Sequence, residues 1–323
     1  MLGWFASQTD VGTINRPGSC AYDPEQQTYT VEGSGANIWG DHDDFHFVWK
    51  RITGDFIVSA RAAFIGTGVE PHRKLGWMIR ADLDSDAANI NTGIHGDGLT
   101  TLQFRRAAGG PTEELRFSLT APDVIQLERQ GNMYSMSVAR FGDPFVTEQI
   151  NHIELGDAVY VGLYVCSHNE AVSEQATFGN VRIVIPAKDD FIPYQDYLGS
   201  HLEVLDADTG QRQIVYSAAE PFEAPNWTPD GAALIYNSGG RLYRFDFVQK
   251  TPVVIDTGFA IKNNNDHVLS FDGSMLGISH HSADDEGHSI VYTLPVGGGT
   301  PKRITAQGPS YLHGWSPDGK FLV

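Results

Sequence analysis

The chain has 323 residues, of which 41% are hydrophobic and 11% aromatic, with 35 glycines, 16 prolines and a net charge of −18. This composition is typical of a globular, turn-rich protein of about two domains. The negative charge disfavours nucleic acid and anionic membrane surfaces as partners. No apolar run approaches the roughly 20 residues of a membrane-spanning helix.

The N-terminal segment "MLGWFASQTDVG" has neither a basic region nor a sustained apolar stretch. We therefore expect no cleavable signal and a cytoplasmic protein. The cysteines are Cys20 and Cys166. Cys166 lies in the strand-like "VYVGLYVCSHN", where a buried thiol is expected, and the sequence leaves open whether the two cysteines pair.

Residues 1–187 alternate apolar and polar side chains over short segments that end in turn residues, as antiparallel strands do. In 54–66, the apolar face consists of Phe56, Val58, Ala60, Ala62 and Phe64. Segments 100–106 and 158–166 show the same alternation, and helical periodicity is almost absent. The pattern predicts an all-β domain built as an antiparallel β-sandwich.

Polar residues collect at strand positions opposite the predicted core of this domain. Arginine suits carboxylates and tryptophan stacks on sugar rings, so one reading is a ligand-binding face. The other is that the arginines pair with acids across an exposed sheet face. His46 is assigned to this face because Phe45 and Phe47 are expected in the core. The candidate ligand-binding residues are Arg61, Arg80, Gln103, Arg105, His95, His46 and Trp77, with Trp39 as a second stacking candidate and His72, Arg73, Lys74 and Asp97 nearby.

The stretch 188–200, "KDDFIPYQDYLGS", has no alternation and is a predicted linker. In 201–323, a Thr/Ser-x-Asp-Gly turn followed by an apolar strand recurs. The turns begin at Thr228, Ser270 and Ser316, which stand 42 and 46 residues apart. That period suits a four-stranded blade and predicts a partial β-propeller of about two and a half blades. Closed propellers need at least about four blades, so we expect the chain to be part of a longer protein.

The repeats resemble those of TolB-type, WD-related β-propellers, with "WSPDGK" and "GGGTPKRIT" close to that family pattern. The first domain resembles concanavalin A-like, laminin-G-like modules found beside sugar-active enzymes, through "GSGANIWGDHDDFHFVWKRITGDF", "HRKLGWMIRADLD" and "HGDGLTTLQFRR". The combination is similar to an uncharacterised bacterial family. These resemblances imply a jelly-roll module with a saccharide or protein ligand.

His267 and His313 each stand three residues before the serine of a repeat turn. In TolB-type blades this position is on or just before the innermost strand, so the resemblance implies that both histidines face one mouth of a channel and lie close together. There they would bind a divalent metal or act as acid and base. Oligogalacturonate lyases are similar in using channel histidines with a metal. The alternative is that both histidines cap the inner loop by hydrogen bonds to the backbone.

Other motifs indicate no specific chemistry. Asp82, Asp84 and Asp86 have calcium-loop spacing but lack the glycine and glutamate of that motif, so a solvated loop is expected there. The loop 279–289, with three histidines, is also expected to be solvated. Two hypotheses follow: a non-catalytic saccharide- or protein-binding protein, and a saccharide-active enzyme with a metal–histidine site. A structural role in cell-envelope assembly follows from the TolB resemblance alone.

Overall fold

The computed structural model describes residues 1–323, which form strands and turns without an α-helix. The predicted all-β class is confirmed; the helical element is one 3-10 turn, Ala283–Asp285. No helix is long and apolar enough to span a membrane. The chain divides into two compact units, residues 1–188 with 205–213, and residues 189–204 with 214–323. The segment 188–200 falls at this division, and the tip of the following hairpin belongs to the first unit.

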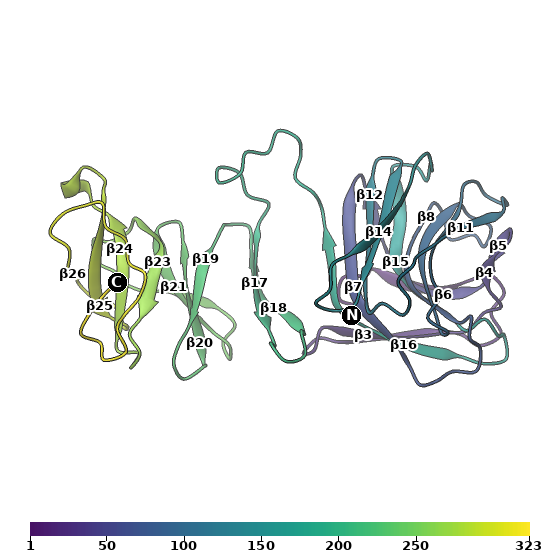
Figure 1. Cartoon of the computed structure of the whole chain (residues 1–323), viewed down its shortest axis with the longest axis horizontal. Helices are drawn as coiled ribbons and strands as arrows, with labels where there is room; N and C mark the ends of the chain where they lie inside the picture. Colours follow the sequence, from purple (N-terminus) through teal and green to yellow (C-terminus); the bar gives the residue numbers. More distant parts are fainter. The chain divides into compact units, whose positions relative to one another are not determined.

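The first unit contains two seven-stranded antiparallel sheets, drawn from purple to teal in Figure 1. The first sheet has the order β1 (Ser7–Val11), β6 (Phe45–Thr53), β15 (Ala158–Cys166), β8 (Lys74–Arg80), β9 (Asn89–His95), β10 (Thr100–Arg105) and β11 (Thr112–Arg116). The second has the order β14 (Val146–Ile150), β13 (Met133–Ala139), β12 (Val124–Gln130), β7 (Phe56–Ile65), β16 (Glu174–Val184), β3 (Thr28–Gly33) and β2 (Ser19–Asp23). A short hairpin joins β4 (Ile38–Trp39) to β5 (His42–Asp43).

The main core lies between these sheets, because alternate residues of each strand face inward. From the second sheet, Phe56 and Val58 of β7 are fully buried there, and from the first, Trp77 and Leu102 are. The core therefore follows the alternation predicted for 54–66 and 100–106. Both cysteines are free, with Cys166 buried.

A second apolar cluster covers the other face of the first sheet. Phe45 and Phe47 of β6 lie in it with Ile38 of the β4–β5 hairpin, and Phe45 packs edge-on against Tyr164 at 5.8 Å between ring centroids. Phe45 and Phe47 are therefore buried in a core as expected, but in this cluster and not in the one between the two sheets. Strands β6 and β15 of this sheet therefore carry apolar residues on both faces, and the hairpin folds over their outer side.

The second unit begins with the two-stranded sheet of β17 (Ser200–Leu205) and β18 (Arg212–Ala218). Two four-stranded antiparallel sheets follow, drawn from green to yellow in Figure 1. One is ordered β19 (Glu223–Trp227), β20 (Ala233–Ser238), β21 (Arg241–Asp246) and β22 (Pro252–Val254). The other is ordered β23 (Asn263–Leu269), β24 (Met275–His281), β25 (Ser289–Pro295) and β26 (Lys302–Arg303). Buried Ile235 and Leu242 of the former join Leu276 and Ile278 of the latter in one apolar cluster.

The predicted repeat is also a repeat of hydrogen bonds. The Thr or Ser hydroxyl at each turn donates to the Asp two residues on, at 2.6, 2.6 and 2.7 Å for Thr228, Ser270 and Ser316. The same hydroxyl accepts the amide N–H five residues on, at 3.0, 3.0 and 2.9 Å. The glycine that closes each turn has φ between +68° and +71°, a conformation that L side chains rarely adopt. Turn chemistry thus explains why this four-residue motif recurs.

Candidate functional site

A groove of about 260 Å³ lies on the outer face of the first sheet, beside the β4–β5 hairpin. Strands β8 to β11 supply its floor. Alternation explains the lining, since Leu75, Ile94 and Leu102 of these strands point into the core and their neighbours point outward. The outward residues that matter below are Lys74, His95, Gln103, Glu114 and Arg116.

Sheet register brings these side chains together in pairs. Lys74 of β8 stands opposite His95 of β9, and Gln103 of β10 stands opposite Glu114 of β11. Directly opposite residues in antiparallel strands have Cβ atoms about 4.5–5.5 Å apart, so each pair presents its polar ends side by side. The groove is therefore a row of hydrogen-bonding groups across four strands.

Trp39 supplies an aromatic surface at the edge of this row. Its side chain is 43% exposed, and Lys74 Nζ lies 6.0 Å from its ring centroid. Lys74 is itself buried, and its ammonium donates to Asn37 Oδ1 at 2.7 Å and to the Ile38 carbonyl at 2.9 Å. Burial lowers the pKa of Lys74. The lysine thereby ties the sheet to the strand that presents the tryptophan.

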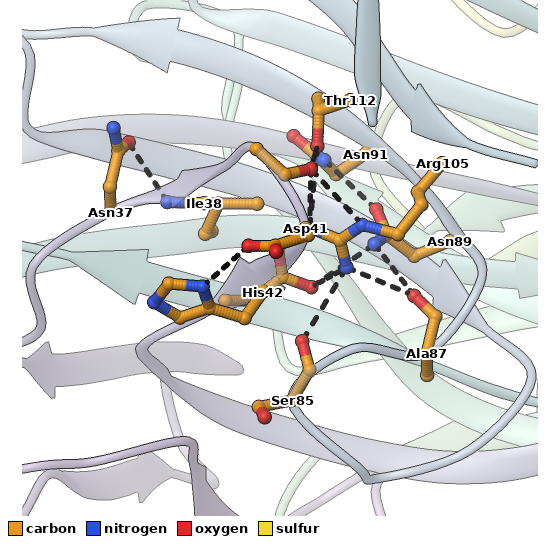
Figure 2. A network of polar contacts seen from close by, with 12 residues as sticks. Asn37, Ile38, Asp41, His42, Ser85, Ala87, Asn89, Asn91, Arg105 and Thr112 are labelled. Atoms are coloured by element: carbon orange, nitrogen blue, oxygen red, sulfur yellow. Dashed lines mark hydrogen bonds and ion pairs between the residues drawn. The ribbon is translucent and has the colours of Figure 1, made fainter. Parts of the chain in front are cut away.

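A buried ionic network holds the β4–β5 hairpin against strands β8 and β10 of the sheet. Asp43 accepts two hydrogen bonds from Arg105, at 2.9 and 2.7 Å, and one from Arg80 at 3.3 Å. Figure 2 shows Arg105 beside Asn89 and the carbonyl oxygens of Ser85 and Ala87. All three ionic side chains are fully buried. Two cations and one anion thus hold the hairpin against the sheet.

Three histidines meet at one end of the groove. The ring of His72 lies 5.9 Å from that of His95 and 5.7 Å from that of His168, between centroids. Burial lowers the pKa of His95 to about 4, with a smaller contribution from the charge of Lys74. Burial also lowers the pKa of His168. His95 is therefore neutral at pH 7.

The predicted ligand-binding residues separate into three groups. His95 and Gln103 lie in the groove, whereas Arg80 and Arg105 are fully buried in the network with Asp43 and do not line it. For these two arginines, pairing with an acid is therefore the correct reading. Arg61 lies on β7 of the other sheet, where it pairs with Asp123 at 2.8 Å.

Two predicted positions are corrected outright. Trp77 is completely buried between the sheets, so its ring cannot stack on an external sugar, and Trp39 has the exposed ring. His46 faces the core side of β6, where Asp10 and Gln8 contact its two ring nitrogens at 2.7 and 3.0 Å. The candidates Arg80, Arg105, Gln103 and His95 lie on the opposite face of the sheet, the same face as Phe45 and Phe47.

Five groove residues are absent from the sequence-based prediction: Asn37, Leu99, Glu114, Arg116 and His168. In "TEELR", the core position of Leu115 places Glu114 and Arg116 outward, so alternation was a usable signal for both. His168 follows β15 in a loop with φ of +57°. No sequence pattern indicated that this loop reaches the groove.

The histidines of the repeats differ in their surroundings. His267 is buried, and its Nε2 lies 3.2 Å from the carbonyl oxygen of Ile235 in the neighbouring sheet. Because a carbonyl only accepts, Nε2 carries the proton. His313 is exposed. No group of three or more His, Cys, Asp or Glu side chains in the structure is arranged to hold a metal ion, including the acidic stretch at 82–86.

Comparison with known proteins gives one extended sequence similarity. No family model matches the chain. An uncharacterised protein of Agrobacterium fabrum is 47% identical over 125 residues, which are 38% of this chain and 42% of that protein. A solved structure from Agrobacterium tumefaciens, provisionally assigned as TolB, is also 47% identical, covering 36% of this chain and 42% of its own, with a TM-score of 0.35. The chain thus spans less than half the length of these relatives.

Several solved structures with sandwich-type folds are similar over about half of the chain. A Saccharomyces cerevisiae protein of unknown function is 14% identical with a TM-score of 0.44, covering 56% of this chain and 97% of its own. The carbohydrate-binding module CBM66 of Bacillus subtilis is 14% identical with a TM-score of 0.35, covering 56% and 96%. At TM-scores below 0.5, these similarities support no argument about function.

Proposed function

We propose that this protein binds a saccharide in the groove on the outer face of the first sheet. The observation that supports the proposal is the exposed ring of Trp39 beside a row of polar side chains that includes His95 and Gln103. An aromatic face packs against the apolar face of a sugar ring, and the polar row offers partners for its hydroxyls. Trp39 is also held in place by Lys74 and by the Asp43 network, so little ordering is required on binding.

A glycan array followed by calorimetry with the retained sugars tests this proposal on the full chain. Trp39→Ala should weaken binding at least tenfold, because truncating an aromatic hot-spot side chain costs about 2 kcal/mol or more and about 1.4 kcal/mol is tenfold. Trp227→Ala is the matched control, since Trp227 is 51% exposed but lies in the other unit. Equal losses of saccharide affinity in both variants would count against binding in the groove. So would a Trp39→Ala variant that binds saccharide like the wild type.

We further propose that the two four-stranded sheets are blades of a TolB-like β-propeller. The observations that support this proposal are the repeated turn and the apolar cluster that the two sheets share. Cross-sheet hydrogen bonds also join equivalent strands, as from Asn226 Nδ2 to the His267 carbonyl at 3.0 Å. An experimental structure of the longest natural form of the chain should place β19 and β23 side by side around one axis. Sheets stacked with β22 or β26 innermost would overturn this assignment.

A further inference from the structure

The hydrogen bond to Glu114 determines the orientation of the Gln103 side-chain amide. Its Nε2 lies 3.4 Å from Glu114 Oε2, and an ionised carboxylate only accepts hydrogen bonds. The NH₂ group must therefore face Glu114, which turns Oε1 the other way. Gln103 is 2% exposed, and no protein group donates to Oε1. The oxygen is buried, so a ligand's donor reaches it only with a small rotation of the Gln103 side chain. A donor would be stabilised there, because a buried acceptor without a donor is costly.

His95 presents a second acceptor to the same groove. Its Nδ1 lies 3.0 Å from the Leu99 carbonyl oxygen, which only accepts, so Nδ1 carries the proton. The ring is neutral at pH 7, as argued above, and Nε2 is then an unprotonated nitrogen. No protein hydrogen bond to Nε2 is present among the contacts of this side chain. His95 thus accepts from a ligand and does not donate to it.

The cations beside these acceptors already have partners. Lys74 donates to Asn37 and to the Ile38 carbonyl. Arg116 lies 2.7 Å from Glu114 Oε1. The groove consequently offers unpaired acceptors and a carboxylate. Each of its two cations already has a protein acceptor, and the Arg116 side chain is 68% exposed.

We infer that the groove takes a neutral, hydroxyl-rich saccharide, whose hydroxyl groups donate to Gln103 Oε1 and His95 Nε2, and that it rejects uronic acids. This inference rests on the proposed saccharide-binding function. A hydroxyl both donates and accepts, so it satisfies these atoms at no charge cost. A uronate carboxylate has no proton to give and would face Gln103 Oε1 and the like charge of Glu114. Buried polar groups left unpaired are the strongest source of discrimination between similar ligands.

The experiment uses the full chain at pH 7 and pairs of probes that differ only at C6. The probes are hexasaccharides of β-1,4-linked glucose and of β-1,4-linked mannose, each beside its uronate form, within an array that also contains amino sugars and other neutral sugars. Neutral sugars should bind at least tenfold more tightly than uronates. Equal or tighter binding of uronates or amino sugars would overturn the inference while leaving the proposed function standing. If no saccharide in the array binds, the proposed function fails, and the inference fails with it.

A single substitution tests whether Gln103 recognises the saccharide or only stabilises the fold. Gln103→Met keeps the side-chain volume and removes the unpaired oxygen, so binding of a retained neutral sugar should weaken about tenfold. Thermal stability should be little changed, because the loss of a buried unsatisfied acceptor offsets the loss of the long hydrogen bond from Nε2 to Glu114. Gln126→Met is the matched control, since Gln126 lies on β12 of the other sheet. Undiminished sugar binding in Gln103→Met would contradict the inference, as would a loss of binding matched by the control.

Discussion

Replacing Asp43 by alanine should destabilise the first unit strongly. The carboxylate and its partners Arg80 and Arg105 are fully buried, so the substitution leaves two guanidinium groups with main-chain carbonyls as partners and also removes the acceptor of the Asn89 amide. Removing one partner of a buried ion pair costs about 3–5 kcal/mol. For a unit of about 190 residues, each kcal/mol lowers the melting temperature by about 2–4 °C. We therefore expect a decrease of about 6–20 °C.

Scanning calorimetry of the full chain measures this effect as a shift of the transition that belongs to the first unit. Glu113→Ala serves as the control, because its ion pair with Arg106 is 2.8 Å long but about half exposed, and such pairs contribute about 0–1 kcal/mol. Asp43→Asn, which keeps the shape but not the charge, should lie between the two. Saccharide binding should fall in step with release of the hairpin that presents Trp39. A melting temperature for Asp43→Ala within 2 °C of the wild type would refute the reasoning.

Three further predictions concern single residues. The pKa of His95 is about 4 in the folded protein and about 6.5 in the unfolded chain. Because protonation favours the unfolded chain, the free energy of unfolding should be highest above pH 6.5. It should decrease by up to about 3 kcal/mol as the pH falls toward 4. Urea unfolding at pH 7 and pH 4.5 should show that the free energy of unfolding falls more with pH for the wild type than for His95→Gln. An equal fall in both proteins would contradict the lowered pKa of His95. His267→Ala should cost about 1–3 kcal/mol, because the buried Ile235 carbonyl loses its donor, whereas exposed His313→Ala should change stability by less than about 0.5 kcal/mol. Elemental analysis of both variants should find metal content unchanged, and a joint loss of metal would support a histidine site instead. Ser270→Ala removes the hydroxyl that makes two hydrogen bonds in its turn and should cost about 1–2 kcal/mol, measured by urea unfolding; an unchanged midpoint would show that the turn does not depend on it.

Within the candidate site, local patterns predicted two residues correctly and misplaced others for a physical reason. His95 and Gln103 were found because each alternates with core residues, Ile94 and Leu102, on its own strand. The same reasoning failed for His46, since four consecutive residues of β6, Phe45 to Val48, are all buried, on one face of the sheet or the other. When both faces of a sheet are covered, alternation still separates the faces but no longer tells which one is the core.

The sequence by itself determined the all-β class, the strand alternation and the repeated Ser/Thr-x-Asp-Gly turn. These features depend on residues within a few positions of one another, so backbone geometry and turn chemistry fix them locally. Only the tertiary structure decided that Trp39 is the exposed ring and Trp77 the buried one. It also decided that Asp43 pairs with Arg80 and Arg105, which stand 37 and 62 residues away. Such pairings arise when a hairpin folds over a distant sheet, and no local pattern along the chain records which face it will cover.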